Sequence, residues 1–323
     1  MCTAVSVRMR EHFFGRNLDM ECSFNESVVI TPRKFPFYFR KSEASEHHYA
    51  FIGTAIVENG VPLYYDATNE KGLSAAALNF PEAEYAKETL GKRNIASFEF
   101  IPRVLCECET VRDVRKLLLH TNVTDMSFNE KYPATPMHWL ISDSKSSITV
   151  EPVGNELKIY DNPVGVLTNS PEFPLQMFNL NNYIHLTENS PENTFLPQNE
   201  LKLYSRGLGA MGLPGDLSSM SRFVRATFTK EKALPKISEQ KSVGQVFHIL
   251  GAVCQQKGAV KLPDGQFEYT VYSSCCNTDS GVYYYTTYYN STVRAVDMHK
   301  EKLDSRALIV YPMKDNREIR VIN

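Results

Sequence analysis

Segments predicted as strands stand at both ends of the chain, and most segments of helical period lie between them. The predicted strands of the N-terminal part are residues 4–9, 12–18, 27–31, 49–57, 63–66 and 73–78. Those of the C-terminal part are residues 267–273, 282–289, 293–298 and 307–311. Strand and helix therefore do not alternate along the chain, which disfavours a doubly wound parallel sheet. We expect stacked antiparallel sheets with helices outside them.

Local signals in the first half and the middle of the chain support this reading. Asn59 and Gly60 form a strong hairpin signal between two predicted strands. Apolar residues from 111 to 118 share one helical face, and Thr110 and Asp113 have the spacing of a capping box. Further helices are predicted at residues 174–186, 221–234 and 242–255, and further strands at 137–142, 147–153 and 157–160. No linker or repeat divides the chain, so we expect one domain.

Composition excludes several classes of protein. The 323 residues are 42% hydrophobic, which is ample for a sizeable core. Lys and Arg number 35 against 37 Asp and Glu, and no basic block is present, which disfavours a nucleic-acid or membrane partner. No apolar run reaches the roughly 18 to 20 residues of a membrane span, and the start lacks a signal-peptide core. The seven cysteines include no CxxC pair, and we interpret them as reduced thiols. Reduced thiols are typical of the cytoplasm, so we expect a cytoplasmic protein.

The segment from Gly207 to Gly212 fits GxGxxG, a pattern of dinucleotide-binding proteins. That fingerprint needs a strand before it and a helix after it, and Pro214 stands where the helix would run. We interpret the segment as a loop, and a nucleotide-dependent oxidoreductase remains one alternative. The cysteine and histidine spacings do not fit a metal site, so we expect neither metal nor organic cofactor.

Cys2 directly follows the initiator methionine. Removal of Met1, expected when the next residue is small, would place a free α-amine on the residue that carries the thiol. An α-amine titrates close to neutral pH and can therefore take and return protons. Nucleophile and base would then occupy one residue. The other interpretation is that Cys2 is incidental and that the chain is a non-catalytic binding protein.

The second predicted strand brings charges towards such a site. In a regular strand, Arg16 and Leu18 lie on one face, and Asn17 and Asp19 lie on the other. A guanidinium beside Cys2 would stabilise its thiolate, and a carboxylate would hold its ammonium form. The alternation predicts that both charges reach one site only if the strand bends there.

Six ordered motifs carry a resemblance to a known family. They are Met1-Cys-Thr3, Phe14-Gly-Arg-Asn-Leu-Asp19, Asn69-Glu-Lys-Gly72, Leu78-Asn-Phe-Pro81, Gly165-Val-Leu-Thr-Asn-Ser-Pro171, and Gly212-Leu-Pro-Gly-Asp216 followed by Ser221-Arg-Phe223. From Cys2 to the Tyr-rich strand near the C-terminus, the chain resembles the choloylglycine hydrolases, which are N-terminal-nucleophile amidases.

The resemblance implies an α+β fold, the four-layer αββα sandwich of two antiparallel sheets flanked by helices, in one domain over residues 2–323. It also implies a homotetramer in the bacterial cytoplasm that needs no cofactor. The implied activity is cleavage of glycine- or taurine-conjugated bile acids, with penicillin V as the alternative substrate. Asn79 favours bile salts, because some penicillin V acylases carry Tyr there.

The resemblance also assigns site residues. It implies Cys2 as nucleophile, Arg16 on the thiol side and Asp19 on the amine side. The backbone amide at Asn79 and the side-chain amide of Asn169 would hold the oxyanion. Arg222 would order Cys2 and its neighbours. The implied steroid pocket consists of Leu18, Phe24, Tyr64, Phe128 and Tyr132.

Overall fold

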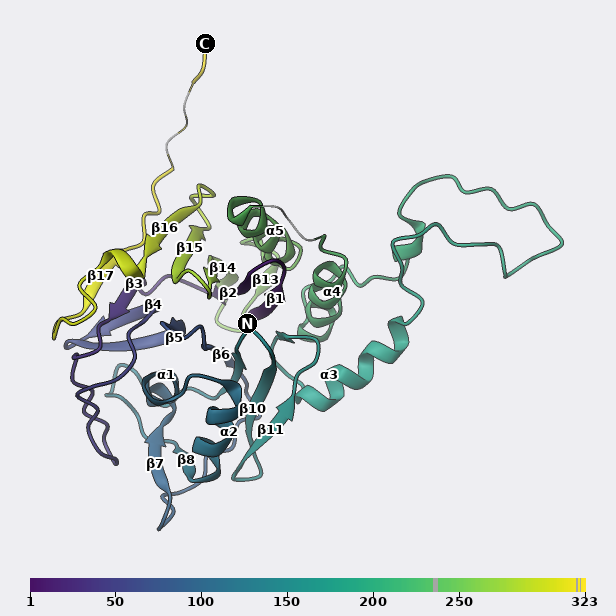
Figure 1. The fold of residues 1–323 in the computed structure, drawn as a ribbon. Helices are drawn as coiled ribbons and strands as arrows, with labels where there is room; N and C mark the ends of the chain where they lie inside the picture. Colours follow the sequence, from purple (N-terminus) through teal and green to yellow (C-terminus); the bar gives the residue numbers. More distant parts are fainter. Residues whose placement is uncertain (235–237, 318, 320) are drawn as a thin grey trace.

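Two antiparallel sheets lie face to face, and helices pack on their outer surfaces (Figure 1). The computed structural model describes residues 1–234, 238–317, 319 and 321–323. Helices α4 and α5 pack on the first sheet, whereas α1 packs on β5 and β6 of the second. The expected four-layer αββα sandwich is therefore confirmed.

The first sheet contains the N-terminal strand. In spatial order its strands are β12 (Val166–Leu167), β1 (Cys2–Arg8), β2 (His12–Met20), β14 (Phe267–Asn277), β15 (Val282–Thr287) and β16 (Arg294–Asp297), with β13 (Val260–Lys261) beside β14. Strand β1 thus lies inside the sheet, between β12 and β2, and Cys2 pairs with Leu18. Strand β2 pairs with β1 on one side and with β14, from the C-terminal part of the chain, on the other.

The second sheet is built from the first half of the chain and one late strand. Its strands, in spatial order, are β11 (Glu156–Asp161), β10 (Ser147–Val153), β9 (Met137–Ser142), β6 (Ser74–Asn79), β5 (Val61–Asn69), β4 (Phe51–Glu58), β3 (Ser27–Thr31) and β17 (Ile309–Pro312). Asn59 and Gly60 connect β4 and β5 with φ angles of 52° and 77°, so the predicted hairpin is confirmed. A separate parallel pair joins β7 (Arg93–Ala96) and β8 (Thr121–Thr124).

Five α-helices and four short 3₁₀ segments lie within the described residues. They are α1 (Phe100–Glu107), α2 (Val111–Leu119), α3 (Phe173–Asn179), α4 (Ser219–Glu231), α5 (Glu239–Gly251), η1 (Ser97–Glu99), η2 (Leu180–Tyr183), η3 (Leu208–Ala210) and η4 (Met298–Lys300). Helix α2 begins with the predicted capping box, in which Thr110 Oγ1 accepts from the Asp113 amide.

One predicted helix is shorter in the structure, two others begin and end earlier than predicted, and the glycine-rich segment is a loop. The helix expected at 221–234 is α4, which ends at Glu231, and the one expected at 242–255 is α5, which begins at Glu239. The helix expected at 174–186 ends at Asn179 and continues only as the 3₁₀ segment η2. The helix expected at 242–255 stops at Gly251, because the Gln255 backbone pairs with Thr270 of β14 instead. Around Gly207 only the three-residue η3 forms, which confirms the loop interpretation.

The chain between η2 and η3 extends away from the body of the molecule (Figure 1). This segment, residues 184–207, is called the arm below. Large apolar side chains on it are exposed, namely Ile184, Phe195, Leu196, Leu201, Leu203 and Tyr204. No helix in the described part of the chain is long and apolar enough to cross a membrane.

A buried histidine lies at the end of β2 that is remote from Cys2. The Nε2 atom of His12 is 2.8 Å from Ser6 Oγ, and its Nδ1 atom is 2.8 Å from Thr278 Oγ1. Burial lowers the pKa of His12 from 6.5 to about 4, because the imidazolium form has no access to water there. The folded protein therefore holds His12 in its neutral form.

This burial predicts an acid-sensitive fold. In the unfolded chain His12 takes up a proton below pH 6.5, whereas in the folded chain it stays neutral down to about pH 4. Burial of His12 therefore lowers the free energy of unfolding only below pH 6.5. As the pH falls from 6.5 to about 4, the free energy of unfolding should decrease by about 3 kcal/mol. His12→Gln should lose this decrease in urea unfolding across that range. The exposed-residue control His120→Gln should keep it, and a wild-type slope in His12→Gln would contradict the prediction.

Candidate active site

The thiol of Cys2 is buried and lies against a buried arginine. Arg16 Nη2 donates to Cys2 Sγ at 2.8 Å. The other terminal nitrogen of Arg16 donates to the carbonyl oxygens of Tyr65 and Ala77, each at 2.8 Å. Burial works against the charge of Arg16, yet its negative neighbours, with Cys2 first among them, raise its pKa above the usual range. Backbone of the second sheet therefore holds a permanent positive charge beside the thiol.

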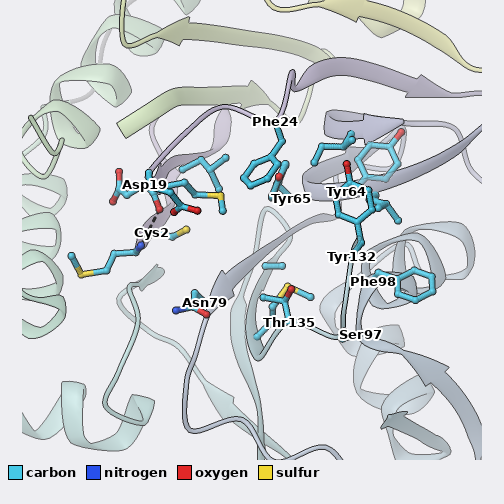
Figure 2. A pocket seen from close by; sticks show the side chains of 18 of the residues that line it. Cys2, Asp19, Phe24, Tyr64, Tyr65, Asn79, Ser97, Phe98, Tyr132 and Thr135 are labelled. Atoms are coloured by element: carbon cyan, nitrogen blue, oxygen red, sulfur yellow. Dashed lines mark hydrogen bonds between the residues drawn. The ribbon is translucent and has the colours of Figure 1, made fainter. Parts of the chain in front are cut away.

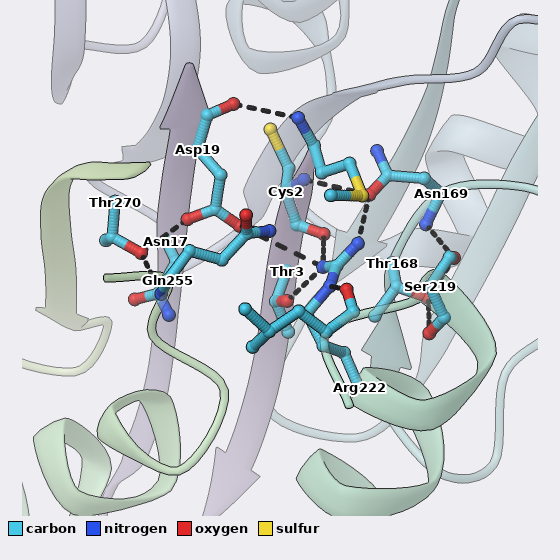
Figure 3. A network of polar contacts seen from close by, with 12 residues as sticks. Cys2, Thr3, Asn17, Asp19, Thr168, Asn169, Ser219, Arg222, Gln255 and Thr270 are labelled. Atoms are coloured by element: carbon cyan, nitrogen blue, oxygen red, sulfur yellow. Dashed lines mark hydrogen bonds and ion pairs between the residues drawn. The ribbon is translucent and has the colours of Figure 1, made fainter. Parts of the chain in front are cut away.

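A second buried arginine holds the backbone of Cys2 from the other side (Figure 3). Arg222, on α4, donates to Cys2 O at 2.5 Å and to Thr3 Oγ1 at 2.7 Å. It also donates to Asn169 Oδ1 at 2.7 Å, and its Nε atom donates to Leu217 O at 3.0 Å. Helix α4 is thereby attached to the beginning of β1.

The side chain of Asn169 connects Cys2 to Asn79. Its Oδ1 atom accepts from Cys2 N at 2.8 Å, and its Nδ2 atom donates to Asn79 O at 2.7 Å. The Asn169 backbone amide donates to Ser219 Oγ at 2.8 Å. The side-chain amide of Asn169 and the backbone carbonyl of Asn79 are therefore neighbours, next to the residue that carries the thiol.

Asp19 is buried beneath the same group of residues. Its carboxylate accepts from Thr270 Oγ1 at 2.6 Å and from Gln255 Nε2 at 3.1 Å, and it lies 4.0 Å from Arg222 Nη1. Burial raises the pKa of Asp19, while the positive charge of Arg222 and the Thr270 hydrogen bond act in the opposite direction. Sequence reasoning missed Thr270 and Gln255, since nothing near them in the chain signals contact with β2.

The predicted alternation of β2 is confirmed, and an irregularity lies where the bend was expected, because the pairing of β14 with β2 shifts between Thr270 and Tyr272, opposite Asp19 and Leu18. Arg16 points to the second sheet, whereas Asn17 donates to Leu250 O of α5 at 2.9 Å and Asp19 meets Gln255 beyond α5. Cys2 reaches both faces because it is the first residue of β1: its side chain contacts Arg16 on one face, and its backbone contacts Arg222 on the other.

The amine of Met1 occupies a defined position. It donates to Asp19 O at 2.9 Å and forms an ion pair with the carboxylate of Glu268. Glu268 is only 5% exposed, and burial raises its pKa. No sequence signal marked Glu268, which lies on β14 beside the start of the chain.

A cavity of about 530 Å³ opens from Cys2 (Figure 2). All five predicted pocket residues line it, as do Cys2, Arg16, Asp19 and Asn79. Asn169 and Arg222 are hydrogen-bonded to each other next to Cys2, and neither lines the cavity. The lining residues that sequence reasoning missed include Met20, Ile56, Leu63, Tyr65, Ser97, Phe98, Met137 and Leu262. Within the described residues, no three His, Cys, Asp or Glu side chains are grouped as metal ligands would be.

An inner-strand cysteine at the start of a four-layer αββα sandwich is the arrangement of N-terminal-nucleophile hydrolases. Comparison with known proteins makes this specific, because the family model for "Linear amide C-N hydrolases, choloylglycine hydrolase family" matches residues 2–311. The chain belongs to the choloylglycine hydrolase family.

Relatives of this chain include named bile salt enzymes. A "Bile salt hydrolase/transferase" of Lactiplantibacillus plantarum is 52% identical over the whole of both chains. A crystal structure of a variant of the conjugated bile acid hydrolase from Clostridium perfringens superposes with a TM-score of 0.92 at 35% identity, again over the whole of both chains. The penicillin V acylase of Agrobacterium tumefaciens shares the fold, with a TM-score of 0.76 at 20% identity, 96% of this chain and 90% of that one being covered.

The Thr270 hydroxyl should contribute measurably to stability. Thr270→Val keeps the shape of the side chain but leaves a buried Asp19 oxygen without its 2.6 Å donor. We expect the free energy of unfolding at pH 7 to fall by about 1–3 kcal/mol in urea titrations. Thr227→Val is the matched control, because Thr227 Oγ1 is buried and has no partner. Equal effects of the two substitutions would contradict the role given to Thr270.

Proposed function

We propose that this chain hydrolyses the amide bond of glycine- and taurine-conjugated bile acids, with Cys2 as nucleophile after loss of Met1. The observation that carries the proposal is the Cys2 thiol, 2.8 Å from Arg16, at an apolar cavity of about 530 Å³. A cavity of this size suits a rigid polycyclic acyl group. The relatives named as bile salt hydrolases support the same substrate class.

The reaction proceeds through a thioester. Cys2 Sγ attacks the carbonyl carbon of the amide, and the free α-amine of Cys2 takes the thiol proton and passes it to the leaving nitrogen. The C–N bond breaks, glycine or taurine leaves, and the acyl group remains on sulfur. Water then attacks the thioester with help from the same amine, which releases the free bile acid and restores the thiol.

The buried charges around Cys2 have separate tasks in this scheme. Arg16 would stabilise the thiolate that forms when the thiol proton leaves, because it donates a hydrogen bond to the Cys2 sulfur. Asp19 would stabilise the α-amine of Cys2 while that amine carries the proton taken from the thiol. Arg222 orders Cys2 through its carbonyl oxygen, at 2.5 Å.

Two neighbouring amides would bind the oxyanion of the tetrahedral intermediate. We assign this role to the backbone N–H at Asn79 and to the side-chain amide of Asn169. The 2.7 Å hydrogen bond between Asn169 Nδ2 and Asn79 O supports the assignment, because it holds Asn169 beside the backbone of Asn79 and leaves one Nδ2 hydrogen for the oxyanion. Each such donor is worth about 10² to 10³ in rate.

The acyl group, more than the amino acid, would provide the binding energy. Leu18, Phe24, Tyr64, Phe128 and Tyr132 all line the cavity and constitute the proposed steroid site. Burial of apolar surface contributes about 25 cal/mol per Å², which favours the large ring system over glycine or taurine. Penicillin V remains the alternative substrate. The presence of Asn79 disfavours it, because some penicillin V acylases carry Tyr at this position.

We further propose a single domain of residues 2–323 that forms a homotetramer in the bacterial cytoplasm. The exposed apolar side chains of the arm support assembly, since Phe195 is 84% and Tyr204 81% exposed. Apolar groups presented on a projecting segment are typical of subunit contacts. Light scattering of the purified protein should give the mass of four chains, and the mass of one chain would contradict the tetramer.

Side-by-side turnover of glycocholate, taurocholate and penicillin V tests the function. We expect release of glycine and taurine from the two bile salts, with slower cleavage of penicillin V. Cys2→Ala should lower turnover by at least about a thousandfold, because no other group can form the acyl intermediate. Preferred cleavage of penicillin V would establish the alternative.

A blocked N-terminus is the control for the mechanism. In a variant with a permanent extension before Cys2, the nitrogen of Cys2 is an amide and cannot accept a proton. We expect this variant to show the circular dichroism of the folded protein and no turnover. Full activity from an intact, extended chain would exclude the α-amine as base.

A further inference from the structure

A buried histidine and a buried carboxylate lie beside the two segments that carry the proposed oxyanion donors. His138 of β9 and Glu151 of β10 are both fully buried, and His138 Nδ1 is 2.9 Å from Glu151 Oε1. Neither residue lines the cavity, and the proposed reaction gives neither a task. Such a pair is often no more stabilising than apolar side chains of similar size, so stability alone does not explain its presence.

The contacts of His138 fix the direction in which its ring donates. Its Nε2 atom donates to Thr168 O at 3.0 Å, because a carbonyl oxygen can only accept. On the other side of the ring, the Glu151 carboxylate also accepts from the Phe173 amide at 3.1 Å. Glu151 is therefore held by backbone, and it keeps the ring of His138 in one orientation.

The hydrogen bond from His138 acts on the peptide group that precedes the Asn169 side chain. Thr168 O belongs to the peptide group whose nitrogen is Asn169 N, and this nitrogen donates to Ser219 Oγ at 2.8 Å (Figure 3). Both polar atoms of the peptide group are thus bound by side chains. Because Asn169 lies two residues beyond the end of β12, its backbone depends on such contacts.

The same ring contacts the segment that carries Asn79. His138 stacks on Phe80, the residue after Asn79, with ring centroids 4.6 Å apart and ring planes 3° from parallel. Phe80 is fully buried, and its amide donates to Pro136 O at 2.9 Å. Asn79 is the last residue of β6, so the contact with His138 fixes the chain at the point where it leaves the sheet.

His138 therefore contacts segments from both sheets. Strands β6 and β9 belong to the second sheet, whereas β12 belongs to the first. Strand pairing fixes Asn79 relative to His138, but it does not by itself fix Asn79 relative to Asn169. Two donors can bind one oxygen only at the right separation, and a displacement of about 1 Å in an active site can cost about 10² in rate.

We infer that His138 is a positioning residue for the oxyanion site. Its ring, oriented by Glu151, holds the Thr168 carbonyl and the Phe80 ring, and it thereby sets the separation between Asn169 and Asn79. His138 acts through these neighbours, since it does not line the cavity itself. This inference rests on the proposed function and deepens it.

Two substitutions separate the ring of His138 from its donor without leaving a buried charge unpaired. In Glu151→Gln, the amide nitrogen can donate to His138 Nδ1 while the amide oxygen accepts from the Phe173 amide, so the bond to Thr168 O is retained. Adding His138→Phe keeps a ring against Phe80 and removes that bond. Relative to Glu151→Gln, we expect kcat for glycocholate to fall about 10- to 100-fold and KM to change less than about twofold.

An aldehyde analogue gives a readout that general loosening of the fold would not change. In this aldehyde, hydrogen replaces the glycine nitrogen on the acyl carbon. Cys2 Sγ adds to that carbon and the thiol proton passes to the carbonyl oxygen, which is then bound in the oxyanion site. The corresponding alcohol binds without a new bond. We expect His138→Phe to raise the inhibition constant of the aldehyde about 10-fold or more, and that of the alcohol less than about twofold.

His48→Phe in the same Glu151→Gln background is the matched control. His48 is also a buried histidine, with its ring nitrogens 2.7 Å from Tyr49 O and 2.8 Å from Phe35 O, and it does not line the cavity. We expect it to keep the kcat and the aldehyde-to-alcohol ratio of the background. The inference is overturned if His138→Phe changes these two quantities no more than His48→Phe does, or if it weakens aldehyde and alcohol equally.

Phe80→Leu tests the same contact if the protein with both substitutions does not fold. It leaves the pair of His138 and Glu151 intact and removes the ring that stacks on His138. We expect a smaller fall in kcat, about 3- to 10-fold, with little change in KM. An unchanged kcat would overturn the inference.

Failure of the proposed function would look different. The wild type would then cleave no conjugated bile acid, whatever residue occupies position 138. Crystal structures of Glu151→Gln with and without His138→Phe then decide the inference. Loss of the 2.7 Å bond between Asn169 Nδ2 and Asn79 O only when His138 is replaced would support it, and the same bond in both structures would overturn it.

Discussion

The buried guanidinium of Arg222 is the contact on which the arrangement around Cys2 depends. A charge removed from water is tolerable only when its donors are satisfied, and here they are met by Cys2, Thr3, Asn169 and the chain before α4. Helix α4, strand β1 and the segment after β12 can therefore occupy only one relative position. Arg16 lies on the opposite face, where its two terminal nitrogens are paired and its Nε is not, so Cys2 is held between two buried cations.

The inner surfaces of the two sheets are joined by polar as well as apolar contacts. Asp66 of β5 is buried and accepts hydrogen bonds from Tyr272 and Tyr283, each at 2.7 Å. Tyr283 also lies 2.6 Å from Thr54 Oγ1 of β4. Tyr272 of β14 and Tyr283 of β15 thus place their rings between the sheets while their hydroxyls satisfy a buried carboxylate. Tyr284 of β15 points the other way and donates to Glu239 of α5. The contacts with Asp66 fix the spacing of the sheets between which the Arg16 side chain lies.

Sequence patterns predicted the structural features that depend on residues close to one another in the chain. The hairpin at Asn59, the capping box at Thr110 and the two faces of β2 each follow from near neighbours in the chain. The site residues came from motif resemblance, and the structure brings them together around Cys2, with all except Asn169 and Arg222 lining one cavity. Their roles remain proposals.

The partners that sequence reasoning missed all depend on long-range pairing. Thr270 and Glu268 meet the N-terminal region only because β14 pairs with β2, more than 240 residues away along the chain. No residue near them encodes that neighbour.

The position of Met1 has a consequence for the order of events during biosynthesis. Its amine is held by Asp19 and Glu268, and the next residue already belongs to a strand enclosed between two others. In the folded protein these contacts would have to break before a peptidase could bind the terminus, although Met1 itself is partly exposed at the cavity. In the nascent chain Glu268 is absent until β14 has been made, so the terminus is free of that ion pair during most of synthesis. Removal of Met1 therefore meets the least resistance before β14 is made.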